Sequence, residues 1–392
     1  MADPTTPRDA HEILDALLAP GETDLAALAM LRPAVREHTR EAYDALYREP
    51  QVLPAPVLHA LAAVTADWQG SGVLGDWHRA QGADPALAAA DAPEEPALAA
   101  LRDHVDLLSV SPALVRAEDQ RRLAEAGHEA TTVVLISQLV AFESHLQRLV
   151  AGLAVLHGLE TAAGAEPPAR EPRTRGRRVE HGGLTVTGRT RPSAFTRETL
   201  QWEPWIDVPA EGELTEEQRD SFASKASTNS VYFRMLSLTP GITRARSALD
   251  NAIFLPRDGL PKAERELAAA ATSKVNDCIY CASVHARKAA GLSKRETEVD
   301  ALLAAELGRD GDWTAADLAP LAAEQDARWA AIVTAAAELS RPRPALRAEH
   351  VTALREHGLE EAEIADALSA AAFFAWANRL MLSLGEPSHP DA

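Results

Sequence analysis

The chain combines 392 residues with a formal net charge of −19, 46% hydrophobic residues and only 5% aromatic residues. Its acidity opposes binding to nucleic acid or to an anionic membrane surface, because both require a basic face. The length exceeds what one hydrophobic core usually supports, so we expect two domains, and the Ala- and Leu-rich composition favours helices.

The N-terminal region and the apolar segments predict a cytoplasmic protein without a membrane helix. The first residues, MADPTTPRDAHEIL, do not place a basic region before an apolar one, as a signal peptide would. No apolar run reaches the roughly 18 residues that a membrane-spanning helix needs. Flavin, nicotinamide and haem signatures and a Gly-rich phosphate loop are missing, so we expect no cofactor.

Helical periodicity dominates the first 160 residues. Asp9 can cap a first helix, and apolar residues at helical spacing predict three more, over 57–68, 95–110 and 131–159. The last of these is apolar over most of its circumference, so we expect a buried helix.

Residues 161–194 are rich in Pro, Gly and Arg and have no apolar period. We interpret them as an exposed linker or arm, although their Arg cluster also suits an acidic surface such as that of a partner subunit. Further on, Trp202 and Trp205 flank a proline. We expect this pair to pack against the following domain, with a substrate wall as the alternative.

A second helical unit is predicted after the linker. Its helices are expected near 215–225 and over 262–275, 278–291, 323–340, 344–356 and 360–384. Pro261 suits a helix start and Gly291 suits the position just after a helix end. Ser293 and Glu296 have the spacing of a capping box for the next helix.

The two halves share a faint repeat. Residues 133–153 align with 364–384 at a constant offset, and residues 58–82 match 267–291 more weakly. The first match pairs Phe142 with Phe373 and Arg148 with Arg379. We interpret the halves as duplicated helical domains of which only the second has cysteines, although Ala-rich helices also resemble each other through composition alone.

Both cysteines of the chain lie in NDCIYCASVH, as Cys278 and Cys281, and His285 follows four residues later. Residues spaced i, i+3 and i+7 share one face of a helix. Cys278 falls at the helix start, where free N–H groups and the helix dipole stabilise a thiolate. The three-residue step also lets the two sulfurs approach disulfide distance.

The preceding helix, LPKAERELAAAATSKVN, carries Glu264 and Glu266, and its Ala-rich stripe predicts close packing against the cysteine helix. A glutamate in an apolar pocket, with a raised pKa, can relay a proton from the attacking thiol. Spacing alone does not distinguish the two glutamates.

Three interpretations of the cysteine segment compete. They are a redox dithiol, a zinc site of two Cys, one His and one Glu, and two core cysteines beside a satisfied histidine. The dithiol is favoured, because structural zinc sites usually draw ligands from two separated clusters, and a chain's only two cysteines rarely form CxxC by chance.

The pattern Glu266, Cys278, Cys281 and His285, within ERELAAAATSKVNDCIYCASVHARKA, resembles the alkyl hydroperoxidase D / carboxymuconolactone decarboxylase superfamily. The flanking FTRETLQWEPWI and AFFAWANRLMLSLG resemble its peroxidase-related subgroup. In this superfamily the resemblance implies that Cys281 is the peroxidatic thiol and lies deeper. Cys278 is then the resolving, more exposed thiol, Glu266 the relay base and His285 its partner.

The same resemblance implies an all-α fold of two fused helical domains. The expected domains are residues 1–160, a degenerate copy without cysteines, and residues 195–392, which hold the CxxCxxxH motif, joined by the linker 161–194. The first domain is then a fused pseudo-subunit, and we expect further self-association into a homo-oligomer.

Three departures qualify this resemblance. Tyr280 stands where hydroperoxidase members have a second histidine, and a tyrosine hydroxyl titrates near pH 10, which weakens the relay. The decarboxylase branch lacks CxxC, so lactone decarboxylation is not expected from the second domain but stays open for the first. His78 lies near the position of the motif histidine in the first domain, and we expect an ordinary, partly exposed histidine there.

Together these features predict a thiol-dependent peroxidase. It would reduce a small hydroperoxide through Cys281 and Cys278 and be recycled by an external dithiol, with no nucleic acid or membrane partner. The alternatives are a non-enzymatic redox sensor or zinc clip in a helical interaction protein, and a decarboxylase-like enzyme of unknown substrate.

Overall fold

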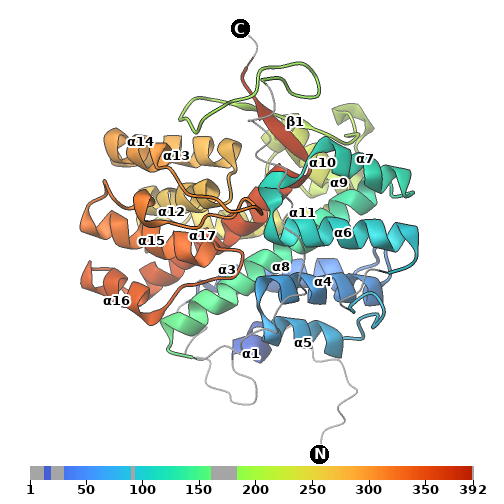
Figure 1. Ribbon diagram of the computed structural model, residues 1–392, viewed down its shortest axis with the longest axis horizontal. Coiled ribbons are helices and arrows are strands. Elements are labelled where there is room, and N and C mark those ends of the chain that lie inside the picture. The colour runs from blue at the N-terminus through green and yellow to red at the C-terminus, as the bar shows by residue number, and fades with distance from the viewer. Residues whose placement is uncertain (1–12, 19–30, 90–92, 160–182, 391–392) are drawn as a thin grey trace, which may run out of the picture.

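The computed structural model describes residues 13–18, 31–89, 93–159 and 183–390, and the regular structure of these residues is almost entirely helical (Figure 1). The expected all-α fold is therefore confirmed. The predicted cap Asp9 and most of the predicted linker lie outside the described residues.

The N-terminal half contributes the helices that Figure 1 shows in blue to green. They are α1 (Ile13–Leu18), α3 (Pro33–Tyr47), α4 (Ala55–Gln69), α5 (Gly72–Ala80), α6 (Pro96–Val110), α7 (Ala117–Glu125) and α8 (Ala130–Leu156), with the 3-10 turn η2 (Pro112–Leu114). The three helices predicted here from periodicity are confirmed as α4, α6 and α8. Helices α3, α5 and α7 were not predicted.

The C-terminal half adds the remaining elements. Its α-helices are α9 (Glu216–Asp220), α10 (Val231–Leu236), α11 (Pro240–Phe254), α12 (Lys262–Val275), α13 (Ile279–Ser293), α14 (Glu296–Ala304), α15 (Ala327–Ser340), α16 (Ala348–Glu356) and α17 (Glu361–Ser383). Its 3-10 turns are η4 (Glu211–Glu213), η5 (Lys225–Asn229) and η6 (Ala319–Leu321). The six helices predicted after the linker are present, with shifts at their ends.

The end of α13 corrects two predictions. The helix runs through Gly291 to Ser293, and the left-handed residue that ends it is Lys294, with φ of 63°. Ser293 is therefore still helical, and its hydroxyl donates to the Ala289 carbonyl at 2.7 Å. It does not form a capping box with Glu296, because Arg295 is the residue that precedes α14.

A small sheet joins two distant parts of the C-terminal half. Strand β1 (Gln201–Pro204) pairs antiparallel with β2 (Gly385–Ser388), with Gln201 opposite Ser388. The described arginines of the predicted linker bind carboxylates of this same sheet: Arg191 lies 2.6 Å from Glu386, and Arg189 lies 3.9 Å from Glu203. In this part of the linker the acidic surface that the arginines contact belongs to the chain itself.

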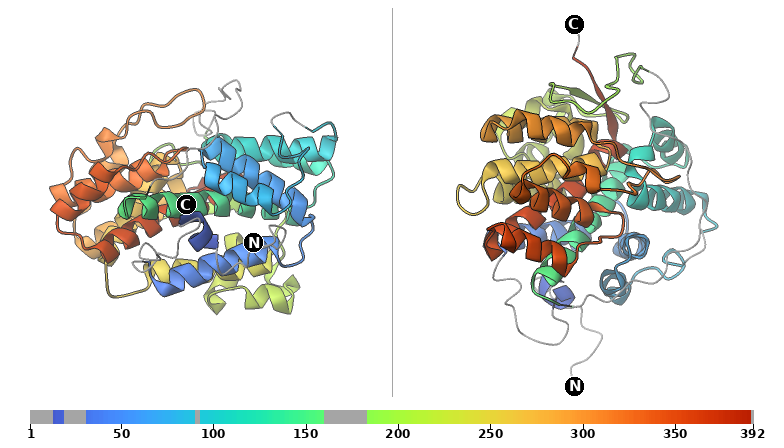
Figure 2. Two further views of the ribbon diagram at one scale, coloured as in Figure 1. Left: turned by 90° about the horizontal axis from the view of Figure 1, so that it is seen from below. Right: turned by 60° about the vertical axis from the view of Figure 1, so that its left-hand side comes forward.

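Helices α8 and α17 pack along each other through the centre of the molecule (Figures 1 and 2). Helix α8 is long and apolar enough to cross a membrane by length and composition, but 89% of its most apolar window is buried inside the protein. It is a core helix, as its pattern predicts. Phe142 of α8 contacts Trp376 of α17 at a ring distance of 5.2 Å, within a hydrophobic core that residues of both halves share.

The two central helices place matching arginines in matching environments. Arg148 and Arg379 are both fully buried, and each donates to the carbonyl four residues before it, at 2.9 and 3.1 Å. Arg148 also donates to the Arg341 carbonyl just after α15, and Arg379 donates to the Ser109 carbonyl at the end of α6. The two arginines that the sequence repeat pairs therefore each contact the backbone of the other half.

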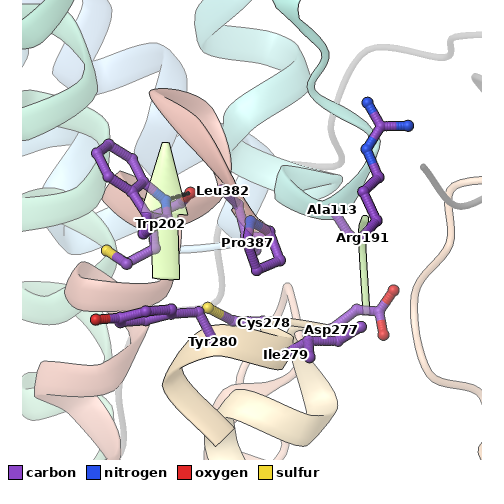
Figure 3. Close-up of a pocket in the computed structure, with 10 residues that line it drawn as sticks. Ala113, Arg191, Trp202, Asp277, Cys278, Ile279, Tyr280, Leu382 and Pro387 are labelled. Atoms are coloured by element: carbon purple, nitrogen blue, oxygen red, sulfur yellow. Dashed lines mark hydrogen bonds between the residues drawn. The ribbon is translucent and has the colours of Figure 1, made fainter. Parts of the chain in front are cut away.

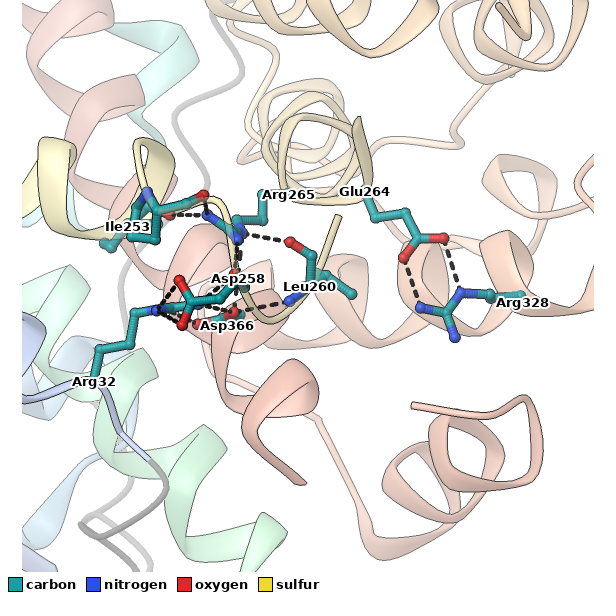
Figure 4. A network of polar contacts seen from close by, with 9 residues as sticks. Arg32, Ile253, Asp258, Leu260, Glu264, Arg265, Arg328 and Asp366 are labelled. Carbon is teal, nitrogen blue, oxygen red and sulfur yellow. Dashed lines mark hydrogen bonds and ion pairs between the residues drawn. The ribbon is translucent and has the colours of Figure 1, made fainter. Parts of the chain in front are cut away.

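A polar network also connects the halves near the start of α12 (Figure 4). The Arg32 side chain, just before α3, lies 2.7 Å from Asp366 of α17 and 3.2 Å from Asp258. Asp366 in turn accepts from the Leu260 backbone N–H at 3.0 Å. The network fixes the loop that leads into α12, and so the start of the helix that carries the site glutamate.

Candidate active site

The two cysteines lie at the turn of a helical hairpin formed by α12 and α13. Asp277, between the helices, adopts a left-handed conformation with φ of 61°. Cys278 is the N-cap of α13, and its sulfur accepts from the Cys281 backbone N–H at 3.4 Å. Asn276 donates to Asn378 of α17 at 3.0 Å, which anchors the turn to the central helix.

The two thiols are free and in contact. The Sγ atoms of Cys278 and Cys281 are 2.6 Å apart, with Cys278 donating. Burial raises the pKa of the Cys278 thiol well above its ordinary value, and its hydrogen bond to Cys281 raises it further. Cys278 therefore keeps its proton and donates it towards the Cys281 sulfur. Closing a disulfide between the two requires little backbone movement.

Glu266 and His285 form the second pair of the site. The Glu266 carboxylate is completely buried on α12 and lies 2.5 Å from Nδ1 of His285, whose side chain is 13% exposed. Lys288 approaches the other carboxylate oxygen at 3.7 Å. The tight packing that brings α12 close follows from its Ala268–Ala271 stripe, which is fully buried as predicted.

The protonation of this pair corrects an expectation. Burial favours a raised pKa for Glu266, but the hydrogen bond from His285 and the charge of Lys288 hold that pKa below its ordinary value. Burial lowers the pKa of His285. The carboxylate is thus ionised and accepts the Nδ1 proton of a neutral imidazole, which leaves Nε2 as the proton-accepting atom of the ring.

The structure also distinguishes the two glutamates that spacing leaves equivalent. Glu264 forms a two-point ion pair with Arg328 of α15, at 2.8 Å for both contacts (Figure 4). Glu266 points into the hairpin instead. Aromatic side chains enclose its partner His285, with Phe374 at a ring distance of 4.2 Å and Phe254 at 5.9 Å.

A pocket of about 430 Å³, counting the part open to solvent, reaches Cys278 (Figure 3). Its lining residues are Ala113, Arg191, Trp202, Asp277, Cys278, Ile279, Tyr280, Met381, Leu382 and Pro387. Trp202 thus forms part of a pocket wall, the alternative considered for it, while its indole N–H donates to the Met381 carbonyl at 3.0 Å. Tyr280 lies beside Cys278 and its pKa is raised by burial.

The expected difference in exposure between the thiols is wrong. Cys278 is 1% exposed and Cys281 is 4% exposed, so both are buried. The reason is that Trp202 and the end of α17 cover the hairpin. What separates the thiols is their surroundings, because Cys278 lines the pocket and Cys281 does not.

The N-terminal half contains a buried polar cluster where a lone histidine was expected. His78 is fully buried, with Nε2 at 3.1 Å from Glu143 of α8 and Nδ1 at 2.9 Å from Nδ1 of His59. Tyr47 donates to the same glutamate at 2.5 Å. The expectation of a partly exposed His78 without a base is therefore wrong, since its carboxylate partner comes from a helix 65 residues later in the chain.

Neither cluster is arranged as a metal site. In the described part of the chain, no group of three or more His, Cys, Asp or Glu side chains has an arrangement that could hold a metal ion. In the cysteine hairpin, the Glu266 carboxylate is directed at His285 and not at the sulfurs.

The comparisons with known proteins bear on this hairpin. Residues 240–325 match the model of the Carboxymuconolactone decarboxylase family. This segment of the chain is similar to that family. The matched segment runs from α11 into the region after α14, so it contains Glu266, Cys278, Cys281 and His285.

A solved structure is also similar to part of this chain. It is described as an alkylhydroperoxidase AhpD core, an uncharacterized peroxidase-related protein from Ralstonia eutropha JMP134. The two are 22% identical, the match covers 48% of this chain and 90% of that one, and the TM-score is 0.36. No curated protein matches this chain.

Proposed function

We propose that this protein is a thiol-dependent hydroperoxidase that cycles between a Cys278–Cys281 dithiol and a disulfide. The observation that carries the proposal is the contact of two free thiols, 2.6 Å apart, in a hairpin that also holds the Glu266–His285 pair. Similarity to the carboxymuconolactone decarboxylase family agrees with a peroxidase-like or decarboxylase-like activity, and the CxxC pair favours the first.

The proposed cycle begins at Cys281, whose thiolate attacks the terminal oxygen of a hydroperoxide. An S–O bond forms, the O–O bond breaks, and the leaving alkoxide takes up the proton that Cys281 gave to His285. Glu266 orients the imidazole and stabilises its protonated form. One turn of helix separates Cys281 from His285, which places them on the same face of α13.

The second half of the cycle belongs to Cys278. Its sulfur attacks the sulfenic acid on Cys281, an S–S bond forms, and the hydroxide leaves with the Cys278 proton as water. An external dithiol then reduces the disulfide by exchange and is itself oxidised. Because Cys278 lines the pocket, it is the sulfur that such a reductant would meet first. A reducing compartment such as the cytoplasm suits this cycle.

We further propose that the N-terminal half is a fused partner without thiols. The reciprocal contacts of Arg148 and Arg379 and the shared core support this duplication. A fused pair of this kind supplies internally the helix packing that a dimer of shorter chains would supply. Sedimentation of the purified protein would measure whether the whole chain also associates with itself.

Turnover tests the proposal. We expect dithiothreitol-dependent consumption of tert-butyl hydroperoxide by the purified, metal-free protein, and no consumption by a Cys281→Ser variant. Reversible thiol oxidation without multiple turnovers would instead identify a redox sensor. Stoichiometric zinc in the purified protein, with thiols protected from oxidation, would identify a zinc clip.

A further inference from the structure

Arg246, on α11, is a buried cation that faces aromatic rings. It is 4% exposed, its Nε has no hydrogen-bond partner, and no carboxylate in the described parts of the chain forms an ion pair with it. Its guanidinium carbon lies 5.0 Å from the ring centre of Phe373 and 5.8 Å from that of Tyr232. Aromatic faces offset only part of the cost of burying a charge.

Tyr232, on α10, is the second polar group of this region. Its hydroxyl is buried and has no hydrogen-bond partner among the residues that the structure describes. Burial raises the pKa of Tyr232, and its ring lies 5.4 Å from that of Trp202, which lines the pocket together with Cys278. The guanidinium supplies donors, and the protonated hydroxyl can donate as well.

The same region adjoins the Glu266–His285 pair. Phe373, which faces Arg246, contacts Phe254 at a ring distance of 6.3 Å, and Phe254 contacts His285 at 5.9 Å. Burial raises the pKa of Asp250, one turn after Arg246, while the charge of Arg246 lowers it. Arg246 is thus linked through two aromatic rings to His285.

We propose that Arg246 and Tyr232 bind the carboxylate of an organic hydroperoxide, so that the substrate class is an amphipathic acid such as a fatty acid hydroperoxide. The guanidinium supplies two parallel N–H donors to the carboxylate, and the hydrocarbon packs on Phe373 and Phe254. This inference rests on the proposed peroxidase function, since it names the substrate of that same site.

Two substrates that differ in the carboxylate charge, an acid and its methyl ester, test whether that charge is recognised. We expect kcat/KM for linoleic acid hydroperoxide to exceed that for its methyl ester by tenfold or more in the wild-type protein. Arg246→Gln should remove the preference, Arg246→Lys should retain part of it, and Tyr232→Phe should reduce it. The control is Arg244→Gln, an exposed arginine of the same helix, which should leave the preference unchanged.

A binding experiment tests this inference independently of the peroxidase proposal. Titration calorimetry of decanoate and decanol into the Cys281→Ser protein requires no turnover. We expect decanoate to bind more tightly, and a further Arg246→Gln change to remove that difference. If neither hydroperoxide oxidises the thiols but decanoate binding still depends on Arg246, the peroxidase proposal fails and the anion site stands. Equal binding of acid and alcohol, or a decanoate preference that survives Arg246→Gln and Arg246→Lys, would overturn the anion site.

Discussion

Ser71 and Cys278 have the same local geometry in two separate helical hairpins. Each is the N-cap of the second helix of a hairpin, and each accepts a hydrogen bond at 3.4 Å from the backbone N–H three residues later. The residue before each has a positive φ, 77° at Gly70 and 61° at Asp277. Setting Ser71 against Cys278 also sets His59 against Glu266 and His78 against His285, and of these two hairpins the second combines thiols with a glutamate.

The first prediction follows from this correspondence. Replacing Ser71 and Leu74 by Cys, in a chain whose natural cysteines are changed to Ser, should give an intramolecular disulfide on mild oxidation. The N-cap geometry already brings these two positions together. Mass spectrometry of the alkylated protein would detect the bond. Two thiols that stay free under conditions that oxidise the natural pair would mean that the two hairpins differ in geometry.

Single substitutions of the two natural cysteines should have different effects on the reaction with hydroperoxide. Cys281→Ser should abolish reaction with hydroperoxide, because the remaining Cys278 keeps its proton. Cys278→Ser should allow one oxidation per chain, trapped as a sulfenic acid by dimedone, and no dithiol-driven recycling. Turnover by Cys278→Ser at the wild-type rate would show that the roles of attacking and resolving thiol are assigned wrongly.

Glu266 offers a test with a close control in the same helix. Glu266→Gln should slow thiol oxidation about a hundredfold or more, because the amide cannot stabilise a protonated His285. Glu264→Gln should leave the rate within about twofold, since Glu264 binds Arg328 of α15. Stopped-flow oxidation by hydroperoxide measures both. Equal rates for the two variants would remove Glu266 from the relay.

Stability should fall as the solution is acidified from pH 7 to pH 5. Burial lowers the pKa of His104 and His145 to about 4, so these histidines are neutral in the folded protein. A folded-state pKa below the ordinary value of about 6.5 means that the stabilisation is complete above pH 6.5 and is lost as the pH falls towards 4.

The variant His104→Leu isolates one such contribution. The wild-type protein loses free energy of unfolding between pH 7 and pH 5, because the proton at His104 is taken up only by the unfolded chain. In His104→Leu this loss should be smaller by about 2 kcal/mol. Urea denaturation at the two pH values gives this difference, and His145→Leu should behave alike. A pH dependence identical to that of the wild type would show that His104 titrates normally in the folded protein.

Local pattern was sufficient for the two central helices and for the hairpin that carries the thiols, but not for α3, α5 and α7. Apolar spacing locates α8 and α17, and the CxxCxxxH spacing puts Cys278, Cys281 and His285 on one face of α13. The choice between Glu264 and Glu266 needs the packing of α12 against its neighbours, which a spacing of two residues does not reveal. The resemblance to the superfamily supplied that choice, and the buried contact with His285 is consistent with it.

The sequence pattern could not predict contacts between residues that are far apart along the chain. Trp202 lines the pocket because β1 pairs with a strand more than 180 residues later, and His78 is buried because Glu143 arrives from α8. Arg246 looks like an ordinary helical arginine until Phe373 and Tyr232 are seen around it. Each case depends on tertiary contacts that override local propensity.

Counting free thiols tests the central claim most directly. The native, metal-free protein would be titrated before and after a small excess of an organic hydroperoxide, and again after treatment with a dithiol. We predict that two reactive thiols fall to none and return to two. Two thiols that do not react with the hydroperoxide and become accessible only on unfolding would contradict the peroxidase account and leave the cysteines as structural residues of the core.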